Sequence, residues 1–367
     1  MELRQHTEQP VRHTLSPVRF PALGLAMLAL LFAAWYGFIR LGWRVSTPRP
    51  ELLIAHGPLM IGGFLGTLIT VERSVALGRR VAYIPPLLTG LGAAALIAGL
   101  PLGVVRVLLV LGSAGLVAIF AYIVRQHPTF YTLTMAGGAV AWFLGNVLWA
   151  AGLPVFRVVL WWMGFLVLTI AGERLELSRV MRIDRRGRAL FAVAVGVFVL
   201  GTVLSHALFD VGSRVAGVGL AATGLWLLRY DIATRTVRRT GLTRFIAVCL
   251  LAGYAWLTIG GLLLAVLGGQ AAGLLYDAIL HSIFLGFVFT VIFGHAPIIF
   301  PSVLGARMDY SPRFYAHLAL LHVSLVLRVG ADLAGWVDGR LWGGLVNIIA
   351  VLLFVGSTGL AIKLRSD

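Results

Sequence analysis

Five histidines lie within apolar segments of this chain, where an ionisable side chain is costly and therefore indicates a function. They are His56 in HGPLMIGGFLGT (56–67), His281 and His295 in HSIFLGFVFTVIFGHAPIIFP (281–301), and His317 and His322 in YAHLALLHVSLVLR (315–328). Neutral imidazole is the commonest metal ligand of proteins and also binds haem iron. The pattern predicts a membrane protein that holds a metal.

Composition agrees with a chain that lipid solvates. Of its 367 residues, 59% are hydrophobic and only 12% are charged, whereas soluble domains carry about a quarter charged residues. The net charge of +16 comes from arginines between apolar segments, so we interpret it as a topology signal with lipid headgroups as partners, not nucleic acid. Cys249 is the single cysteine, which excludes an internal disulfide, an iron–sulfur cluster held by this chain alone and covalent c-type haem.

Apolar runs long enough to span a bilayer, about 20 residues each, predict an all-α protein of twelve transmembrane helices. A cytoplasmic tail, 1–19, precedes one transmembrane domain, 20–363. The loops 101–102 and 208–212 are very short, so the boundaries between the third and fourth spans and between the seventh and eighth spans are the least secure. The predicted spans are 20–42, 51–78, 81–100, 102–125, 130–153, 155–178, 188–208, 210–229, 244–268, 271–301, 312–335 and 340–363.

Arginine distribution predicts the orientation. Most basic residues fall on one side, including the clusters in 174–188 and 229–244, and cytoplasmic loops carry such an excess. Both termini are then cytoplasmic, and we expect a multi-pass membrane protein. The second and tenth spans both run from outside to inside, which places His56 and His281 towards the outer side.

Two neutral imidazoles at similar depth on two helices suit the ligation of a b-type haem. Met60 lies on the same helical face as His56, as do the small residues Gly63, Thr67 and Thr70. We interpret this face as room for a porphyrin edge. The alternative is that small residues mark tight helix packing and that the histidines only make structural hydrogen bonds.

Two charged residues accompany this pair. Asp277 lies one helical turn before His281 and is placed to accept its second ring N–H, as ligating histidines require; the alternative is an exposed carboxylate at the membrane edge. Arg328 lies deep in the eleventh span and must pair. Its candidate partners are Asp332, one turn later, and the propionates of a haem.

A second site is predicted near the cytoplasmic side. His295 lies about 21 Å along the helix from His281, so one metal cannot use both. His317 and His322 begin the next span at the same depth, but five residues rotate about 140°, so His317 is the better ligand. With Glu72 and Glu173 they suit copper, iron or zinc, or a proton relay. The alternative is that both glutamates form interfacial ion pairs with the arginines that follow them, Arg73 and Arg174.

Three stretches resemble the NnrS family of haem- and copper-containing bacterial membrane proteins linked to nitric oxide and denitrification. They are His56 with the glycine-rich run 62–64, His281 with Gly286 and Gly294-His295, and 315–328. The resemblance covers about a quarter of the chain. It implies a twelve-helix fold like the haem-copper oxidase catalytic subunit, with low-spin haem held by the second and tenth helices, which fall on His56 and His281.

The chain also departs from that pattern. Oxidases place copper ligands on the sixth and seventh helices, where this sequence offers Glu173 and His206, and the His-x-His pair of the tenth helix is missing. The run GHAPIIFP (294–301) differs from the GHTGR-like run of NnrS proteins. An oxygen-reducing binuclear centre is therefore not expected, and the chain resembles a divergent relative.

Three classes of function follow. The first is a membrane haem b protein, with copper or another transition metal at a second site, that works on nitric oxide as sensor, scavenger or electron-transfer partner of a quinol or cytochrome. An oxidoreductase acting on nitric oxide or quinol would belong to this class. The second is a proton-coupled secondary transporter, which glycine-interrupted helices at Gly260-Gly261 and Gly343-Gly344 would suit. The third is a non-catalytic subunit of a respiratory complex.

Overall fold

A computed structural model describes residues 17–46, 49–181 and 183–363. Within them twelve helical spans are long and apolar enough to cross a membrane, which confirms the predicted number. The third and fourth spans separate at residues 99–101, close to the predicted 101–102, whereas the seventh and eighth separate at 205–208, before the predicted 208–212. Residues 1–16 of the predicted cytoplasmic tail lie outside the described residues.

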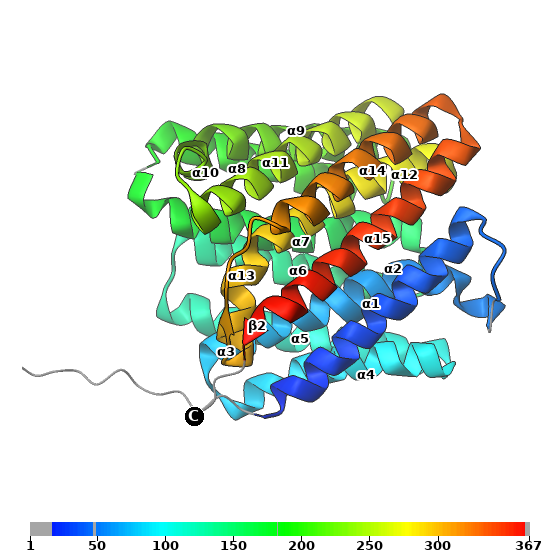
Figure 1. Cartoon of the computed structure of the whole chain (residues 1–367), viewed down its shortest axis with the longest axis horizontal. Coiled ribbons are helices and arrows are strands. Elements are labelled where there is room, and N and C mark those ends of the chain that lie inside the picture. Colours follow the sequence, from blue (N-terminus) through cyan, green and yellow to red (C-terminus); the bar gives the residue numbers. More distant parts are fainter. Residues whose placement is uncertain (1–16, 47–48, 182, 364–367) are drawn as a thin grey trace, which may run out of the picture.

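Most spans are single helices, and Figure 1 shows them as one oblique bundle in which α1 lies beside α15. The single helices are α1 (Arg19–Leu41), α5 (Leu102–Gln126), α6 (Phe130–Ala150), α7 (Val155–Leu177), α8 (Arg185–Leu204), α9 (Phe209–Tyr230), α11 (Gly241–Leu267), α14 (Phe314–Ala334) and α15 (Val337–Ala361). The third span joins η3 (Arg80–Tyr83) to α4 (Ile84–Ala98). Between spans lie η4 (Ser178–Met181), α10 (Ala233–Thr236) and β1 (Arg307–Met308), and β1 pairs antiparallel with β2 (Ile362–Lys363), which follows the last span.

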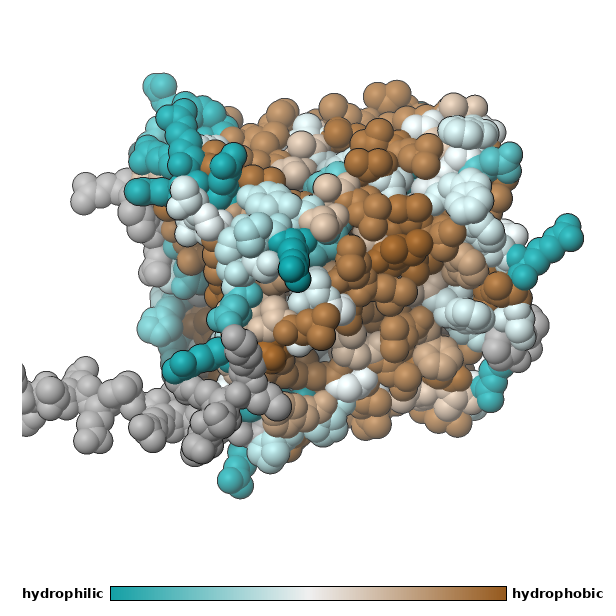
Figure 2. All heavy atoms as spheres, in the orientation of Figure 1, coloured by the Kyte–Doolittle hydropathy of each residue, from teal (hydrophilic) through white to brown (hydrophobic). Residues whose placement is uncertain are grey.

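The surface of the bundle is what a bilayer requires. Large aliphatic side chains face outward along the helices; Val266 and Val323, for example, are each 70% exposed. Figure 2 shows hydrophobic residues over the middle of the molecule and hydrophilic ones gathered towards its ends. Water would not tolerate so large an apolar surface, whereas lipid does. The chain is therefore a multi-pass membrane protein.

Glycines let neighbouring helices touch closely. A Cβ at Gly261 of α11 would collide with the backbone of Ala221 in α9, and one at Gly343 of α15 would lie 2.8 Å from the backbone nitrogen of Arg328 in α14. Such close backbone approach is typical of membrane helix packing. Both glycine pairs, Gly260-Gly261 and Gly343-Gly344, lie inside uninterrupted helices. The broken helices expected of a transporter at these positions are therefore wrong.

The second and tenth spans are built alike. The second consists of η1 (Pro50–Ala55), α2 (His56–Pro58), η2 (Leu59–Gly66) and α3 (Thr67–Leu77), and the tenth of α12 (Leu274–His281), η5 (Ser282–Phe289) and α13 (Thr290–Leu304). In each span a π-helical stretch, η2 or η5, begins within three residues of the histidine. π-Helical turns are rare and frequently occur at functional sites. Phe64 and Phe289, each eight residues after its histidine, stack at 6.0 Å.

Candidate functional site

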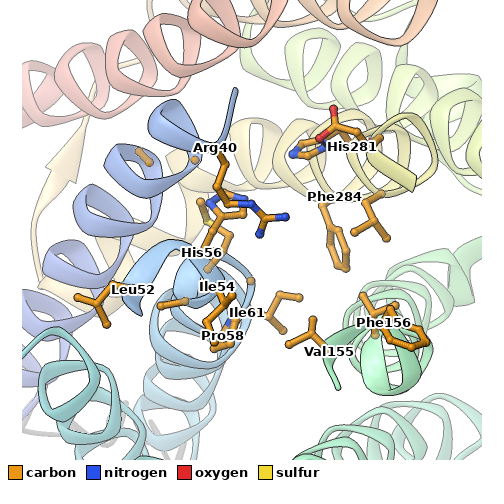
Figure 3. A pocket seen from close by; sticks show the side chains of 18 of the residues that line it. Arg40, Leu52, Ile54, His56, Pro58, Ile61, Val155, Phe156, His281 and Phe284 are labelled. Carbon is orange, nitrogen blue, oxygen red and sulfur yellow. Dashed lines mark hydrogen bonds and ion pairs between the residues drawn. The ribbon is translucent and has the colours of Figure 1, made fainter. Parts of the chain in front are cut away.

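The structure brings His56 and His281 together from these two spans. Their ring centroids lie 6.4 Å apart, and the ring planes differ by 30°. Figure 3 shows both side chains bordering one open space. Of the five histidines that the sequence singled out, these two form the predicted pair.

The hydrogen bonds fix how each ring presents its nitrogens. His56 Nδ1 lies 2.7 Å from the carbonyl oxygen of Ala33 in α1, and His281 Nδ1 lies 2.9 Å from that of Asp277. A carbonyl only accepts, so both Nδ1 atoms carry the proton and donate it. In the neutral imidazole Nε2 then keeps its lone pair. This is the tautomer that a metal ligand needs.

Helix α1 makes room for the first of these rings. A Cβ at Gly37 would lie 2.9 Å from His56 Nδ1 and 3.0 Å from its Cε1. Gly37 follows Ala33 by one helical turn, so one face of α1 supplies both the acceptor and the space. The sequence offered no signal that paired this glycine with His56.

The spacing of the rings fits one metal ion between them. A metal–imidazole nitrogen bond is about 2.0–2.1 Å and the ring centre lies about 1.1 Å beyond, so two opposed imidazoles have centroids about 6.3 Å apart. The observed separation is 6.4 Å. Within the described ranges no group of three or more His, Cys, Asp or Glu side chains could hold a metal ion. Two imidazoles alone do not complete a protein metal site, whereas haem supplies four further nitrogens.

A cavity of about 1190 Å³ adjoins the two histidines, larger than a typical small-molecule site of about 300–1,000 Å³. Apolar side chains form much of its wall, among them Ile61, Trp149 and Phe284, and the predicted Met60 also lines it. The cationic lining residues are Arg40, Arg49, Arg106, Arg328 and Arg340. The cavity thus suits a large, flat, apolar molecule that carries negative charge.

Asp277 connects His281 to this positive charge. Arg328 donates to it through Nε at 2.8 Å and Nη2 at 3.0 Å, and its Oδ1 lies 3.3 Å from His281 Nδ1. The Asp277 side chain is 13% exposed. The alternative of an exposed carboxylate is therefore wrong. The carboxylate lies beside His281 as expected, but the hydrogen bond of His281 Nδ1 goes to the backbone carbonyl of Asp277 and not to its side chain.

Arg328 does not pair with Asp332, as its position one turn earlier had suggested. Asp332 instead lies 3.1 Å from Arg340 Nε of α15. The reason is geometric: Arg328 faces α12, where Asp277 accepts two of its donors in a planar fork, and that arrangement is the stronger one for a guanidinium.

The residues of the predicted second site do not converge. His295 Nδ1 lies 2.9 Å from the carbonyl oxygen of Val291, and its Nε2 lies 3.3 Å from Arg174 Nη1, so that Nε2 is the acceptor of this bond. Arg174 also donates to Asp231 from Nε at 2.8 Å, and Tyr254 donates to the same carboxylate at 3.1 Å. The lone pair that a metal would need is used within a buried polar network.

The two glutamates match the ion-pair alternative in part. Arg73 contacts both Glu72 and Glu173, although we expected Glu173 to pair with Arg174. Arg174 instead pairs with Asp231, whose side chain is 0% exposed. Asp231 follows α9 directly, and the sequence analysis did not single it out.

His317 and His322 are separate from one another and from His295 in their contacts. His317 is 1% exposed, bonds Ser357 through Nδ1 at 3.2 Å, and packs against Phe245, Phe293, Phe314 and Phe354. His322 accepts a hydrogen bond from Trp256 at 3.0 Å. Among the described side chains, His317 and His322 therefore have different partners, and a second metal at these residues stays a prediction.

The fold and the paired histidines together define a polytopic all-α membrane protein with a largely apolar cavity, lined in part by arginines, between its helices. Comparison with protein families gives the more particular assignment: the profile described as "Domain of unknown function (DUF8744)" matches residues 19–362. The chain therefore belongs to this family. A search of curated proteins returned no match.

Proposed function

We propose that this protein is a membrane-bound b-type haem protein in which His56 and His281 would hold the iron. One observation carries the proposal: two imidazoles, both held as Nδ1–H donors, lie 6.4 Å apart beside a large cavity. The proposal includes the resemblance to NnrS proteins, an orientation with both termini in the cytoplasm, and a bacterial cytoplasmic membrane as the location.

The chain's own residues would set the properties of that cofactor, whose iron supplies one-electron chemistry when bound. The carbonyls of Ala33 and Asp277 hold both imidazoles in one tautomer, and the Asp277 carboxylate beside His281 increases its basicity as a ligand. Gly37 and the π-helical stretches position the rings. The apolar wall excludes water, which raises the influence of each nearby charge.

With both imidazoles holding it, the haem would supply one-electron chemistry, and we propose electron transfer with a quinol or cytochrome as donor. Work on nitric oxide, as sensor or scavenger, is the second form of this proposal. The hydrogen bond of His56 reaches another helix, whereas that of His281 stays within its own helix, so the two imidazoles are held differently.

A proton-coupled transporter is the second candidate, and one observation favours it. Arg174, Asp231, Tyr254 and His295 form a buried polar network, and ionisable groups inside a membrane often mark a substrate or proton path. The uninterrupted helices α11 and α15 remove the other feature that favoured this class.

The visible spectrum of the detergent-purified protein, with a pyridine haemochrome assay, tests the proposal. We expect low-spin bands and about one haem b per chain. His56→Ala and His281→Ala should each abolish these bands, whereas His295→Ala should retain them. Imidazole added to His56→Ala should restore low-spin bands if the variant is folded. A colourless wild-type protein, or low-spin bands that survive both substitutions, would overturn the ligand assignment.

A further inference from the structure

The charges that line the cavity show which part of a ligand each wall would contact. We propose that Arg40, Arg49 and Arg106 bind the two propionate carboxylates of the haem, and that Arg328 does not. This inference rests on the proposed haem function and goes beyond it by orienting the cofactor within the cavity.

Two of the five lining arginines are already neutralised by the protein. Arg328 uses Nε and Nη2 on the carboxylate of Asp277, and Arg340 lies 3.6 Å from Asp277 and 3.1 Å from Asp332. A propionate at Arg328 could use only the N–H groups that Asp277 leaves free, beside a charge that Asp277 already neutralises, and Asp277 also lies beside His281.

The other three arginines have no carboxylate partner among the described side chains. Arg49 donates to the carbonyl oxygen of Ala98. Arg106 lies over the ring of Trp149 at 5.1 Å, and its buried Nε has no hydrogen-bond partner in the described structure. Arg40 lines the cavity near the end of α1, and Figure 3 shows its side chain near that of His56 in this view.

The chemistry of the arginines indicates the ligand. Arg40 and Arg49 are exposed and Arg106 is half-buried, and arginine binds carboxylates through parallel hydrogen bonds. Arg40 belongs to α1, Arg49 contacts the end of α4 and Arg106 belongs to α5, whereas Asp277 and Arg328 belong to α12 and α14. A flat apolar molecule with two carboxylates on one edge matches an apolar cavity lined by arginines that lack a carboxylate partner.

The test compares haem with its dimethyl ester, in which both carboxylates are neutral. The full-length protein, prepared with little haem, is titrated in detergent with each compound, and the low-spin bands report binding. Charge-assisted hydrogen bonds contribute about 1.5–3 kcal/mol each, so esterification should weaken binding at least about tenfold in the wild type. In the triple variant Arg40→Met/Arg49→Met/Arg106→Met the acid and the ester should bind with similar affinity.

Arg328→Met is the matched control, because Arg328 lines the same cavity from α14 but already has Asp277 as its partner. Because Arg328 acts through Asp277, this variant should alter the haem spectrum or stability but keep the acid-to-ester ratio of the wild type. A ratio that collapses in Arg328→Met and persists in the triple variant would overturn the inference. Equal binding of acid and ester by the wild type would overturn it too, while leaving the haem proposal standing. Binding of neither compound would refute the haem proposal itself.

Discussion

Asp277→Asn is the substitution whose effect the structure defines best. The Asp277 carboxylate accepts two hydrogen bonds from Arg328, whose side chain is 8% exposed, and lies near Arg340. Asparagine has nearly the same shape but removes the negative charge, so Arg328 is left buried and uncompensated. Removing one partner of a buried ion pair costs about 3–5 kcal/mol. Since the amide oxygen still accepts one hydrogen bond, we expect a loss of about 2–4 kcal/mol in the free energy of unfolding.

The matched control is Asp210→Asn. Asp210 pairs with Arg214 at the same 2.8 Å distance, but the two side chains are 57% and 43% exposed. Exposed helical pairs of this spacing contribute about 0.3–0.5 kcal/mol. Unfolding by heat and by denaturing detergent should therefore separate the two variants clearly.

A double variant isolates the ion pair. Asp277→Asn/Arg328→Met removes both charges, and we expect it to recover most of the stability that Asp277→Asn loses. If haem is bound, Asp277→Asn should keep the low-spin bands, because the backbone carbonyl that holds His281 is unchanged, and should raise the midpoint potential. Equal effects of Asp277→Asn and Asp210→Asn on stability, or no recovery in the double variant, would refute the reasoning.

Three further predictions follow from single contacts. Gly37→Ala should weaken or abolish the low-spin bands, because its Cβ would lie 2.9 Å from His56 Nδ1. The control Gly24→Ala, on the same helix and with no atom within 4 Å of the added Cβ, should leave the bands unchanged. Equal spectra of the two variants would contradict the role of Gly37. Asp231→Asn should destabilise the protein by about 3–5 kcal/mol, since it leaves the buried Arg174 uncompensated, and a thermal midpoint within a degree of the wild type would exclude this. His206 accepts a hydrogen bond from Trp161, and its pKa is lowered by burial and, to a smaller extent, by the charge of Arg157. The stability that neutral His206 contributes is therefore complete above the ordinary histidine pKa and is lost as the pH falls below it. Thermal unfolding from pH 8 to pH 5 should show a steeper loss for the wild type than for His206→Gln, and parallel curves would refute this assignment.

The sequence alone determined the class of protein and the main candidates. Twelve apolar runs of sufficient length predict twelve spans, because the thickness of the bilayer sets the length of a helix that crosses it. Arginine counts gave a topology in which His56 and His281 share a depth, and the structure places these two rings together. The predicted contact between Asp277 and His281 follows from helical periodicity, which is a local property of the chain.

Partners between distant helices were decided only by the tertiary structure. Arg328 pairs with Asp277 of α12 and not with its near neighbour Asp332, and His295 meets Arg174 and not His317. Helical periodicity gives the face on which a side chain lies, but not which helix packs against that face or how closely. The same holds for the room that Gly37 leaves beside His56 and for the cavity whose arginines lack carboxylates. These features depend on the separation of several helices at once, so only the packed bundle defines them.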